Sequence, residues 1–333
     1  YSGVPVQEPS PYVPFVPQLG LEQLGTGPGL FAANEPDGAR YWFPCNDHPR
    51  DKATFRFELV VPPGLVGAAN GRLVETKEGM LQAFPDGSAG DLYVWEHDFP
   101  VATAFATVAV GNYERLDSTS PEGVRLRTYV PGDQQDRFER AAARVGQAVD
   151  WMGDLFGPYP FEEFGYLVVE GLGGSLETQT MVLLDSTMID EDTMVHELAH
   201  MWFGDWVSLD SWGDIWRSEG FATYVSLLWR TRDNPAELER TMAEIARFYE
   251  ENPSDYPLNN PPPAEMFGGD SYIKGALVAH ALRLEVGDEA FRRGLRAYFQ
   301  RYGGGTASHA QFQAVMEEAA GKPLQAFFEN WFE

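Results

Sequence analysis

The sequence is poor in basic residues and has only one cysteine, and both scarcities exclude classes of protein. It contains 24 Lys and Arg against 50 Asp and Glu, which gives a net charge of −26. A surface that binds nucleic acid needs clustered Lys and Arg, so the charge argues against a nucleic-acid partner. Because Cys45 is the only cysteine, no intramolecular disulfide can form, and the fold has to rely on packing or on a bound metal.

Long hydrophobic runs and a secretory signal are also missing. The longest apolar stretch, near residues 101–110, is far shorter than the roughly 20 residues that a membrane helix needs. We therefore predict no membrane span, and we interpret the protein as cytoplasmic, with secretion as the alternative. In contrast, 44% of the residues are hydrophobic and 14% aromatic, enough for a large core, and a length of 333 residues favours two domains over one.

The chain divides into a strand-rich part, residues 1–113, and a mainly helical part, residues 114–333. Short runs rich in Val, Phe, Tyr and Thr, separated by Gly and Pro turns, predict strands at 53–63, 91–100 and 102–113. Apolar residues spaced three and four apart predict helices at 136–157, 235–252, 272–287 and 308–321. The predicted fold class is therefore α+β, with an antiparallel β-sheet domain followed by a mainly helical domain.

The helical part contains a segment, residues 193–206, that reads TMVHELAHMWFGDW. On an α-helix, His196 and His200 lie on one face one turn apart, where two imidazoles can reach a single ion. Glu197 points sideways from them, as expected of a base beside a metal-bound water rather than of a ligand. The alternative is two core histidines that are satisfied by hydrogen bonds.

A third ligand is available further along the chain. A second amphipathic segment begins near Ile215 and carries Glu219. Two helices packed antiparallel would bring this carboxylate to the histidines. Three protein ligands and one open position are typical of a catalytic zinc site, so we predict one Zn²⁺ per chain, held by His196, His200 and Glu219.

Several motifs together carry a resemblance to a known family. HELAHMWFG is followed by the glutamate of SEGFATY, with eighteen residues between this glutamate and the second histidine. Further matching stretches, in order, are ARYWFPCNDHPRDKATF (39–55), FGPYPFEEFGYLVV (156–169), GGSLETQT (173–180) and SYIKGALV (271–278). With these motifs the sequence resembles the gluzincin aminopeptidases, the family of aminopeptidase N and leukotriene hydrolase.

The resemblance implies a β-domain followed by a thermolysin-like zinc peptidase domain, with the N-terminal β-strands of the family missing from this chain. It implies a zinc aminopeptidase that acts on peptides with a free N-terminus. Tyr272 matches the catalytic tyrosine of the family, and Glu177 matches its amine-binding glutamate. Leu176 and Thr178 differ from the usual Met and Asn of that motif. The family usually has a Gln near residues 33–35, and we carry no role over to Ala33, Asn34 or Glu35.

The expected chemistry assigns one role to each residue. Glu197 takes a proton from the zinc-activated water and passes it to the leaving amine. The Tyr272 phenol donates to the developing oxyanion. Glu177 pairs with the α-ammonium of the substrate, because an unpaired buried cation is costly. The backbone at Gly173 and Gly174 approaches the substrate chain.

Two alternative functions remain open, and Asp214 and four further histidines also need an interpretation. An epoxide hydrolase could reuse the zinc site, and a non-catalytic interaction module would be expected to have lost His196, Glu197 or Tyr272. Asp214 either orients a ligand histidine or is an ordinary acid near a helix N-terminus. The histidines without ligand spacing are interpreted as structural or surface residues, namely His48, His97, His280 and His309.

Overall fold

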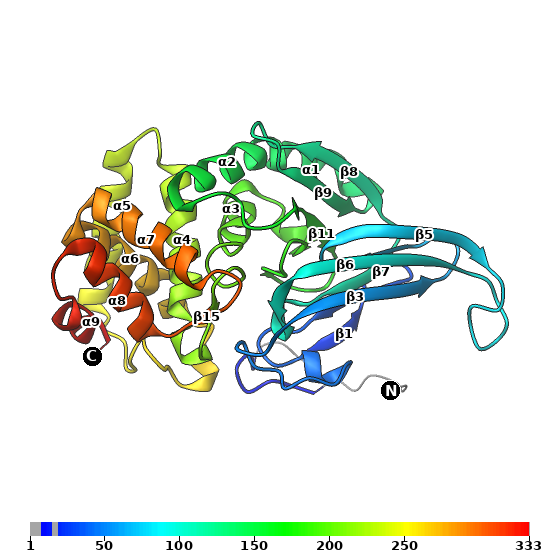
Figure 1. Cartoon of the computed structure of the whole chain (residues 1–333), viewed down its shortest axis with the longest axis horizontal. Helices are drawn as coiled ribbons and strands as arrows, with labels where there is room; N and C mark the ends of the chain where they lie inside the picture. The colour runs from blue at the N-terminus through cyan, green and yellow to red at the C-terminus, as the bar shows by residue number, and fades with distance from the viewer. Residues whose placement is uncertain (1–7, 15–18, 333) are drawn as a thin grey trace.

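The computed structural model of the chain describes residues 8–14 and 19–332. Strands make up the first part of the chain, and helices dominate the second. Figure 1 shows the two parts on opposite sides of the molecule. This arrangement confirms the predicted α+β class. Within the described residues, every helix is too short or too polar to span a bilayer.

Two antiparallel sheets form the N-terminal half. One has the order β1-β2-β7-β4 and the other the order β3-β6-β5. Their strands are β1 (Gly20–Gln23), β2 (Leu30–Ala33), β3 (Lys52–Val61), β4 (Val66–Ala69), β5 (Arg72–Met80), β6 (Gly90–Ala102) and β7 (Val108–Gly111). The strand predicted at 102–113 is shorter than expected, because a 3₁₀ turn at Thr103–Phe105 separates β6 from β7.

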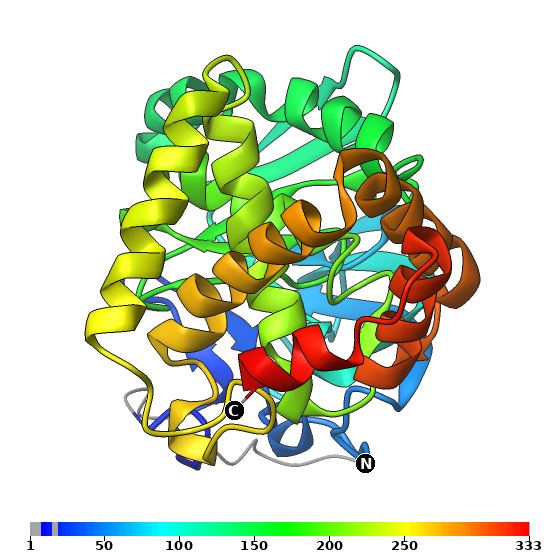
Figure 2. The ribbon, with the colours of Figure 1, turned by 90° about the vertical axis from the view of Figure 1, so that its left-hand side faces the viewer.

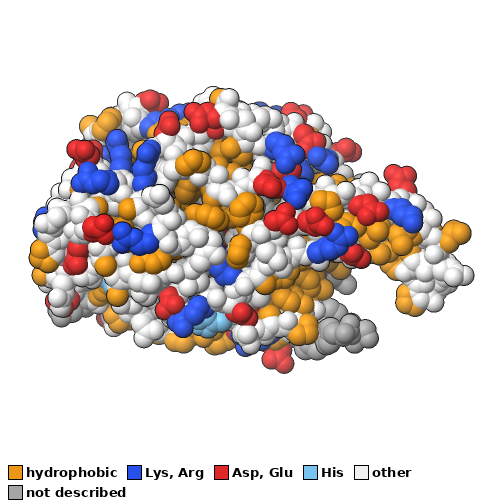
Figure 3. Space-filling view, viewed as in Figure 1, with side chains coloured by type: hydrophobic (Ala, Val, Ile, Leu, Met, Phe, Trp, Pro, Cys, Tyr) orange, Lys and Arg blue, Asp and Glu red, His pale blue; other side chains and the backbone are white. Residues whose placement is uncertain are grey.

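The β5–β6 hairpin projects from the rest of the molecule (Figure 1). Hydrophobic side chains gather along it on the face shown in Figure 3. Leu81 follows β5 and is 87% exposed, and Val74 on β5 is 40% exposed. The described residues of this hairpin do not line the cavity that lies between the two halves.

A third, six-stranded sheet begins the second half, which the sequence predicts to be mainly helical. Its order is β10-β9-β11-β13-β12, with β8 paired to β9. The strands are β8 (Glu114–Thr119), β9 (Arg125–Val130), β10 (Glu163–Phe164), β11 (Tyr166–Val169), β12 (Ser175–Leu176) and β13 (Val182–Asp185). Every residue of β11 and β13 is buried, as expected of parallel strands covered on both faces. β12 is antiparallel and lies at the sheet edge.

Helices complete the second half and face the viewer in Figure 2. They are α1 (Gln135–Ala141), α2 (Val145–Phe156), α3 (Glu191–Ala199), α4 (Trp216–Arg230), α5 (Pro235–Glu251), α6 (Gly275–Val286), α7 (Asp288–Tyr302), α8 (His309–Ala320) and α9 (Gln325–Phe332). The helix predicted at 136–157 is interrupted between α1 and α2 by a 3₁₀ turn. The helix predicted at 272–287 starts earlier, as a π-helical turn at Asp270–Lys274 that leads into α6.

Helices α3 and α4 are the elements that position the site. Asp190 caps α3 by accepting a hydrogen bond from the Thr193 N–H at 3.0 Å. α4 is buried along most of its length and crosses α6 with almost no space between the backbones. A Cβ built on Gly220 of α4 would lie only 2.5 Å from the carbonyl carbon of Gly275 on α6. Only glycine therefore permits this approach.

Candidate active site

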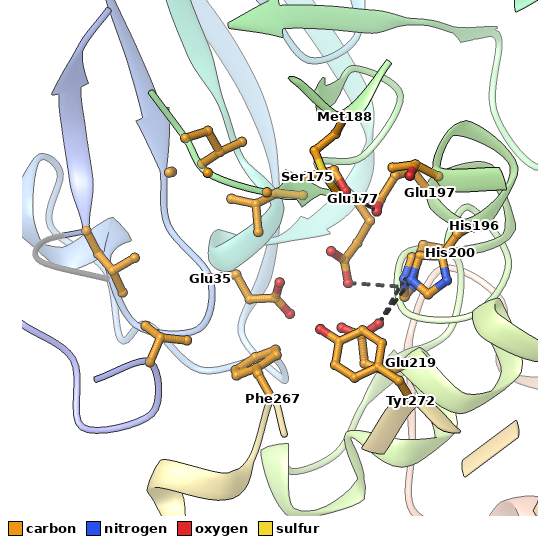
Figure 4. A pocket seen from close by; sticks show the side chains of 18 of the residues that line it. Glu35, Ser175, Glu177, Met188, His196, Glu197, His200, Glu219, Phe267 and Tyr272 are labelled. Atoms are coloured by element: carbon orange, nitrogen blue, oxygen red, sulfur yellow. Dashed lines mark hydrogen bonds and ion pairs between the residues drawn. The ribbon is translucent and has the colours of Figure 1, made fainter. Parts of the chain in front are cut away.

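The three predicted metal ligands converge on one point. Nε2 of His196 lies 3.1 Å from Nε2 of His200. Oε2 of Glu219 lies 3.2 Å from the first nitrogen and 3.3 Å from the second. α3 and the turn that follows it supply the histidines, and the first turn of α4 supplies the glutamate. Figure 4 shows the side chains pointing toward one another, so a single ion could contact all of them.

Hydrogen bonds on the far side of the histidines fix their orientation. Nδ1 of His200 donates to the carbonyl of Phe203 at 3.0 Å and lies 3.1 Å from the hydroxyl of Ser218. Nδ1 of His196 lies 3.5 Å from the hydroxyl of Thr223. A proton on Nδ1 leaves the lone pair on Nε2, and Nε2 is the atom that faces the convergence point.

The carboxylates around this point perturb one another and the histidine. Burial raises the pKa of Glu219, but His200 and His196 outweigh it and hold the value at about 2. Burial lowers the pKa of His200, yet Glu177 and Glu219 raise it well above its usual value. Burial raises the pKa of Glu177 to about 7, with His200 opposing. The raised pKa of His200 shows that the carboxylates around it favour a positive charge among them.

One carboxylate oxygen of Glu197 accepts a hydrogen bond, and the other has no hydrogen-bond partner among the described residues. Oε1 accepts a hydrogen bond from the hydroxyl of Ser175 at 2.6 Å. Oε2 is buried and has no hydrogen-bond partner among the described residues. Ser175 belongs to the glycine-rich segment but was not singled out from the sequence. Its hydroxyl fixes the Glu197 carboxylate beside the ligands and leaves the second oxygen able to accept a proton.

Tyr272 reaches the site from the π-helical turn before α6. Its ring stacks on His196, with the ring centroids 6.0 Å apart and an interplanar angle of 22°. Burial raises the pKa of Tyr272 well above its usual value, and the Glu219 and Glu35 carboxylates add to the effect. The phenol therefore keeps its proton at neutral pH and can donate a hydrogen bond.

Glu177 follows edge strand β12 and faces the ligands from the opposite wall. Oε1 of Glu177 lies 3.5 Å from Nδ1 of His200 and has no hydrogen bond among the described residues. Gly173 and Gly174 line the same cavity, and a Cβ at either would meet no atom within 4 Å. Gly173 has φ +74°, and its N–H donates to Asp185 at 3.0 Å.

Glu35, to which the sequence analysis assigned no role, lies beside Glu177. Carboxylate oxygens of Glu35, Glu177 and Glu219 are all within 4.8 Å of one another. Burial raises the pKa of Glu35 well above its usual value, and the charge of Glu177 raises it further. The one sequence signal for this neighbourhood is the Gln that the family usually has near residues 33–35. Glu35 lies in the turn after β2 and reaches the site from a distant part of the chain.

Asp214 does not orient a ligand histidine. Its Oδ2 accepts hydrogen bonds from Nη2 of Arg217 at 3.0 Å and from the N–H of His309 at 3.1 Å. Of the two alternatives, the structural one is therefore correct. Two other histidines interpreted as structural or surface residues, His97 and His280, are buried away from the cavity.

The predicted site residues all line one cavity of about 690 Å³ between the two halves. Among the described residues, its lining contains no Lys or Arg. A cavity of this size with a few convergent polar groups is typical of a site for a small molecule or a short peptide.

The β-rich half, the helical half and the His-His-Glu site between them define a metallopeptidase-like architecture. Residues 160–331 match the model of the peptidase family M1 domain, and residues 25–92 match that of the peptidase M1 N-terminal domain. The chain therefore belongs to peptidase family M1.

Curated relatives are similar over most of this chain. Aminopeptidase M1-A of Oryza sativa subsp. japonica is 28% identical over 324 residues, which cover 89% of this chain and 36% of the relative. Aminopeptidase N of Streptomyces lividans is 27% identical over 337 residues, which cover 91% of this chain and 38% of the relative. The chain thus spans about a third of the length of these relatives.

A solved structure shares the fold over nearly the whole chain. A mutant of the M1 zinc metallopeptidase from Deinococcus radiodurans, bound to a Tyr-Ser-Ala substrate, matches with a TM-score of 0.85 and 29% identity. The match covers 99% of this chain and 74% of that one.

Proposed function

We propose that the protein is a zinc-dependent aminopeptidase that hydrolyses the N-terminal residue from peptides. The observation that carries the proposal is the shared cavity, in which the convergent His196, His200 and Glu219 lie close to Glu197 and to Glu177. The names of the curated relatives and the tripeptide bound to the Deinococcus enzyme support the same activity.

The donor set fits zinc. Ligand atoms around a tetrahedral zinc with bonds of about 2.1 Å are about 3.4 Å apart, and the three atoms here are separated by 3.1–3.3 Å. Two imidazoles and one carboxylate are a ligand set found in catalytic zinc sites. We therefore propose that His196, His200 and Glu219 hold one Zn²⁺. When bound, zinc supplies Lewis-acid chemistry that activates water and polarises a carbonyl.

Glu197 is proposed to transfer a proton, and Tyr272 is proposed to stabilise the negative charge that develops on the substrate. Oε2 of Glu197 accepts the proton of the attacking water and passes it to the leaving amine, while Ser175 holds Oε1 in place. The Tyr272 phenol remains protonated and donates to the oxyanion that forms on the scissile carbonyl.

Glu177 and Glu35 are proposed to select the free N-terminus. Two buried carboxylates close together repel each other, and a substrate α-ammonium between them removes the repulsion. Carboxylate oxygens of this pair lie within 4.8 Å of Glu219, so an amine held there would be close to the proposed zinc. The backbone at Gly173 and Gly174 would contact this part of the peptide.

A pair of peptides of one sequence, one free and one N-acetylated, tests the proposal. We expect mass spectrometry to show stepwise loss of N-terminal residues from the free peptide and almost none from the acetylated one. Glu177→Ala should lower kcat/KM for the free peptide by a factor equivalent to about 2 to 4 kcal/mol, as for truncating one partner of a buried charge pair.

The matched control is Glu75→Ala, because Glu75 is an exposed carboxylate on β5, away from the cavity. It should leave kcat/KM unchanged. Equal cleavage of both peptides, or internal fragments, would contradict the aminopeptidase activity. Hydrolysis of neither would favour the epoxide hydrolase or the non-catalytic module.

A further inference from the structure

One carboxylate of the cavity has no role in the proposed reaction. Glu22 lies on β1 and lines the cavity together with residues of the metal site. Among the described residues, no hydrogen bond or ion pair reaches its carboxylate, and its pKa is raised to about 7 by burial alone. A partly dehydrated carboxylate without a partner is costly unless a ligand supplies the cation.

The other acids of the cavity are already paired or assigned. Glu219 contacts the histidines, and Glu197 accepts from Ser175. Asp192 forms an ion pair with Arg230 at 3.0 Å. Glu35 and Glu177 are within reach of one ammonium group, so among the described residues of the lining Glu22 alone remains available for a second cation.

The part of the cavity near Glu22 is the part that would receive the first side chain of a substrate. In Figure 4, Glu35 lies between the histidines and the blue strands of the N-terminal half. A substrate whose amine is held at Glu35 and Glu177 therefore places its first residue on the β-domain side.

The surroundings of Glu22 suit a long aliphatic stem that ends in a charge. Apolar residues share the lining with it, namely Val13, Leu19, Ala33, Leu172 and Leu176. The register pairs Glu22 with Phe31, four residues before Glu35. β2 ends at Ala33, and both Ala33 and Glu35 in the turn beyond it line the same cavity as Glu22. A lysine or arginine carries a cation at the end of a long apolar stem, which suits a carboxylate beside apolar side chains.

We propose that Glu22 makes this site selective for peptides whose first residue is Lys or Arg. The inference rests on the proposed function, because it takes the α-ammonium to be held at Glu35 and Glu177. The stem of the first residue packs on the apolar wall, and its terminal cation pairs with Glu22.

Two substrates of similar shape test the proposal, a fluorogenic lysyl amide and the corresponding norleucyl amide. We expect the zinc-loaded protein to prefer lysine, and Glu22→Gln to lower the lysine-to-norleucine ratio of kcat/KM by about tenfold or more. Glu75→Gln removes the same charge outside the cavity and should keep the ratio. An unchanged ratio in Glu22→Gln, or no preference for lysine in the wild type, would overturn the proposal.

Calorimetric binding of free L-lysine and L-norleucine separates this inference from the proposed function. If the protein hydrolyses neither amide, the aminopeptidase activity is refuted. The calorimetric affinities for the two amino acids then test the role of Glu22 independently. Tighter binding of lysine that is lost in Glu22→Gln supports the specificity pocket. Equal binding of both amino acids overturns it.

Discussion

At the scale of the residue, the buried glutamates Glu219 and Glu197 of the cavity have different partners. Glu219 contacts both histidines through Oε2, whereas Glu197 contacts Ser175 and keeps one oxygen free. Both side chains are buried glutamates, so their different partners, and not their chemistry, distinguish their proposed roles.

This difference predicts the behaviour of two isosteric variants. Glu197→Gln should retain about one zinc per chain, because the ligands are untouched, but lower kcat about 10²- to 10⁴-fold through loss of the base. Tyr272→Phe should lower kcat about 10²- to 10³-fold with little change in KM, because the phenol acts only on the transition state. Metal analysis and steady-state kinetics with an aminoacyl amide measure both effects.

Tyr256→Phe is the matched control for the tyrosine. Tyr256 lies outside the cavity, and its hydroxyl donates to Glu265 at 3.3 Å. Its variant should retain the kcat of the wild type. A kcat close to that of the wild type in Glu197→Gln or Tyr272→Phe would remove the proposed role of that residue.

At the scale of the element, the crossing of α4 and α6 links Glu219, the proposed zinc ligand, to the turn that carries Tyr272. Gly220 follows Glu219 directly, and Gly275 lies three residues after Tyr272. The contact of these glycines therefore sets the distance between the two functional side chains. A helix crossing without glycine would separate them.

Gly220→Ala should destabilise the protein by about 1 to 3 kcal/mol, because the new Cβ overlaps the backbone of α6. Gly153→Ala is the control, since Gly153 lies within α2 and a Cβ there meets nothing within 4 Å. It should stabilise by about 0.5 to 1 kcal/mol through helix propensity. Urea unfolding measures both, and equal stability of Gly220→Ala and the wild type would contradict the close approach.

At the scale of the whole molecule, buried polar contacts join the β-rich half to the helical half. His97 of β6 is 2% exposed, and its Nε2 accepts a hydrogen bond from the Gln179 amide at 2.8 Å. Lys52 of β3 donates to the carbonyl of Asp205 at 2.8 Å. The cavity lies between these halves, so the interface also maintains the shape of the site.

This interface should make stability depend on pH. Burial, and secondarily the Lys52 charge, lower the pKa of His97 from its usual 6.5 to about 4. The unfolded chain therefore takes up a proton that the folded protein excludes. The contribution of His97 to stability is complete above about pH 6.5 and is lost as the pH falls toward 4, by about 2 kcal/mol at about pH 5.

His97→Gln is the variant that measures this effect, since glutamine keeps an acceptor for Gln179 but does not titrate. Urea unfolding at neutral pH and near pH 5 should show a smaller loss of stability in the variant than in the wild type. His309, whose pKa is also lowered to about 4, is present in both proteins and cancels from the difference. Parallel losses in both proteins would exclude a contribution from His97.

Features that depend on the spacing of nearby residues could be predicted from the amino-acid sequence alone. The spacing of His196 and His200 places them one turn apart wherever the helix lies, and apolar periodicity located α5 and α8 to within a residue. The family followed from ordered motifs. The division of the chain at residue 113, the missing N-terminal strands and the cytoplasmic location stay predictions.

The tertiary structure alone shows which distant residues share the cavity. Glu22 comes from β1, Glu35 from the turn after β2, and Ser175 and Glu177 from a sheet edge. No periodicity relates these positions to α3. The tertiary structure also assigned Asp214 to Arg217 instead of a ligand histidine. The physical reason is that local hydrogen bonding fixes a helix face, whereas contacts between residues far apart in the chain depend on how the sheets and helices pack.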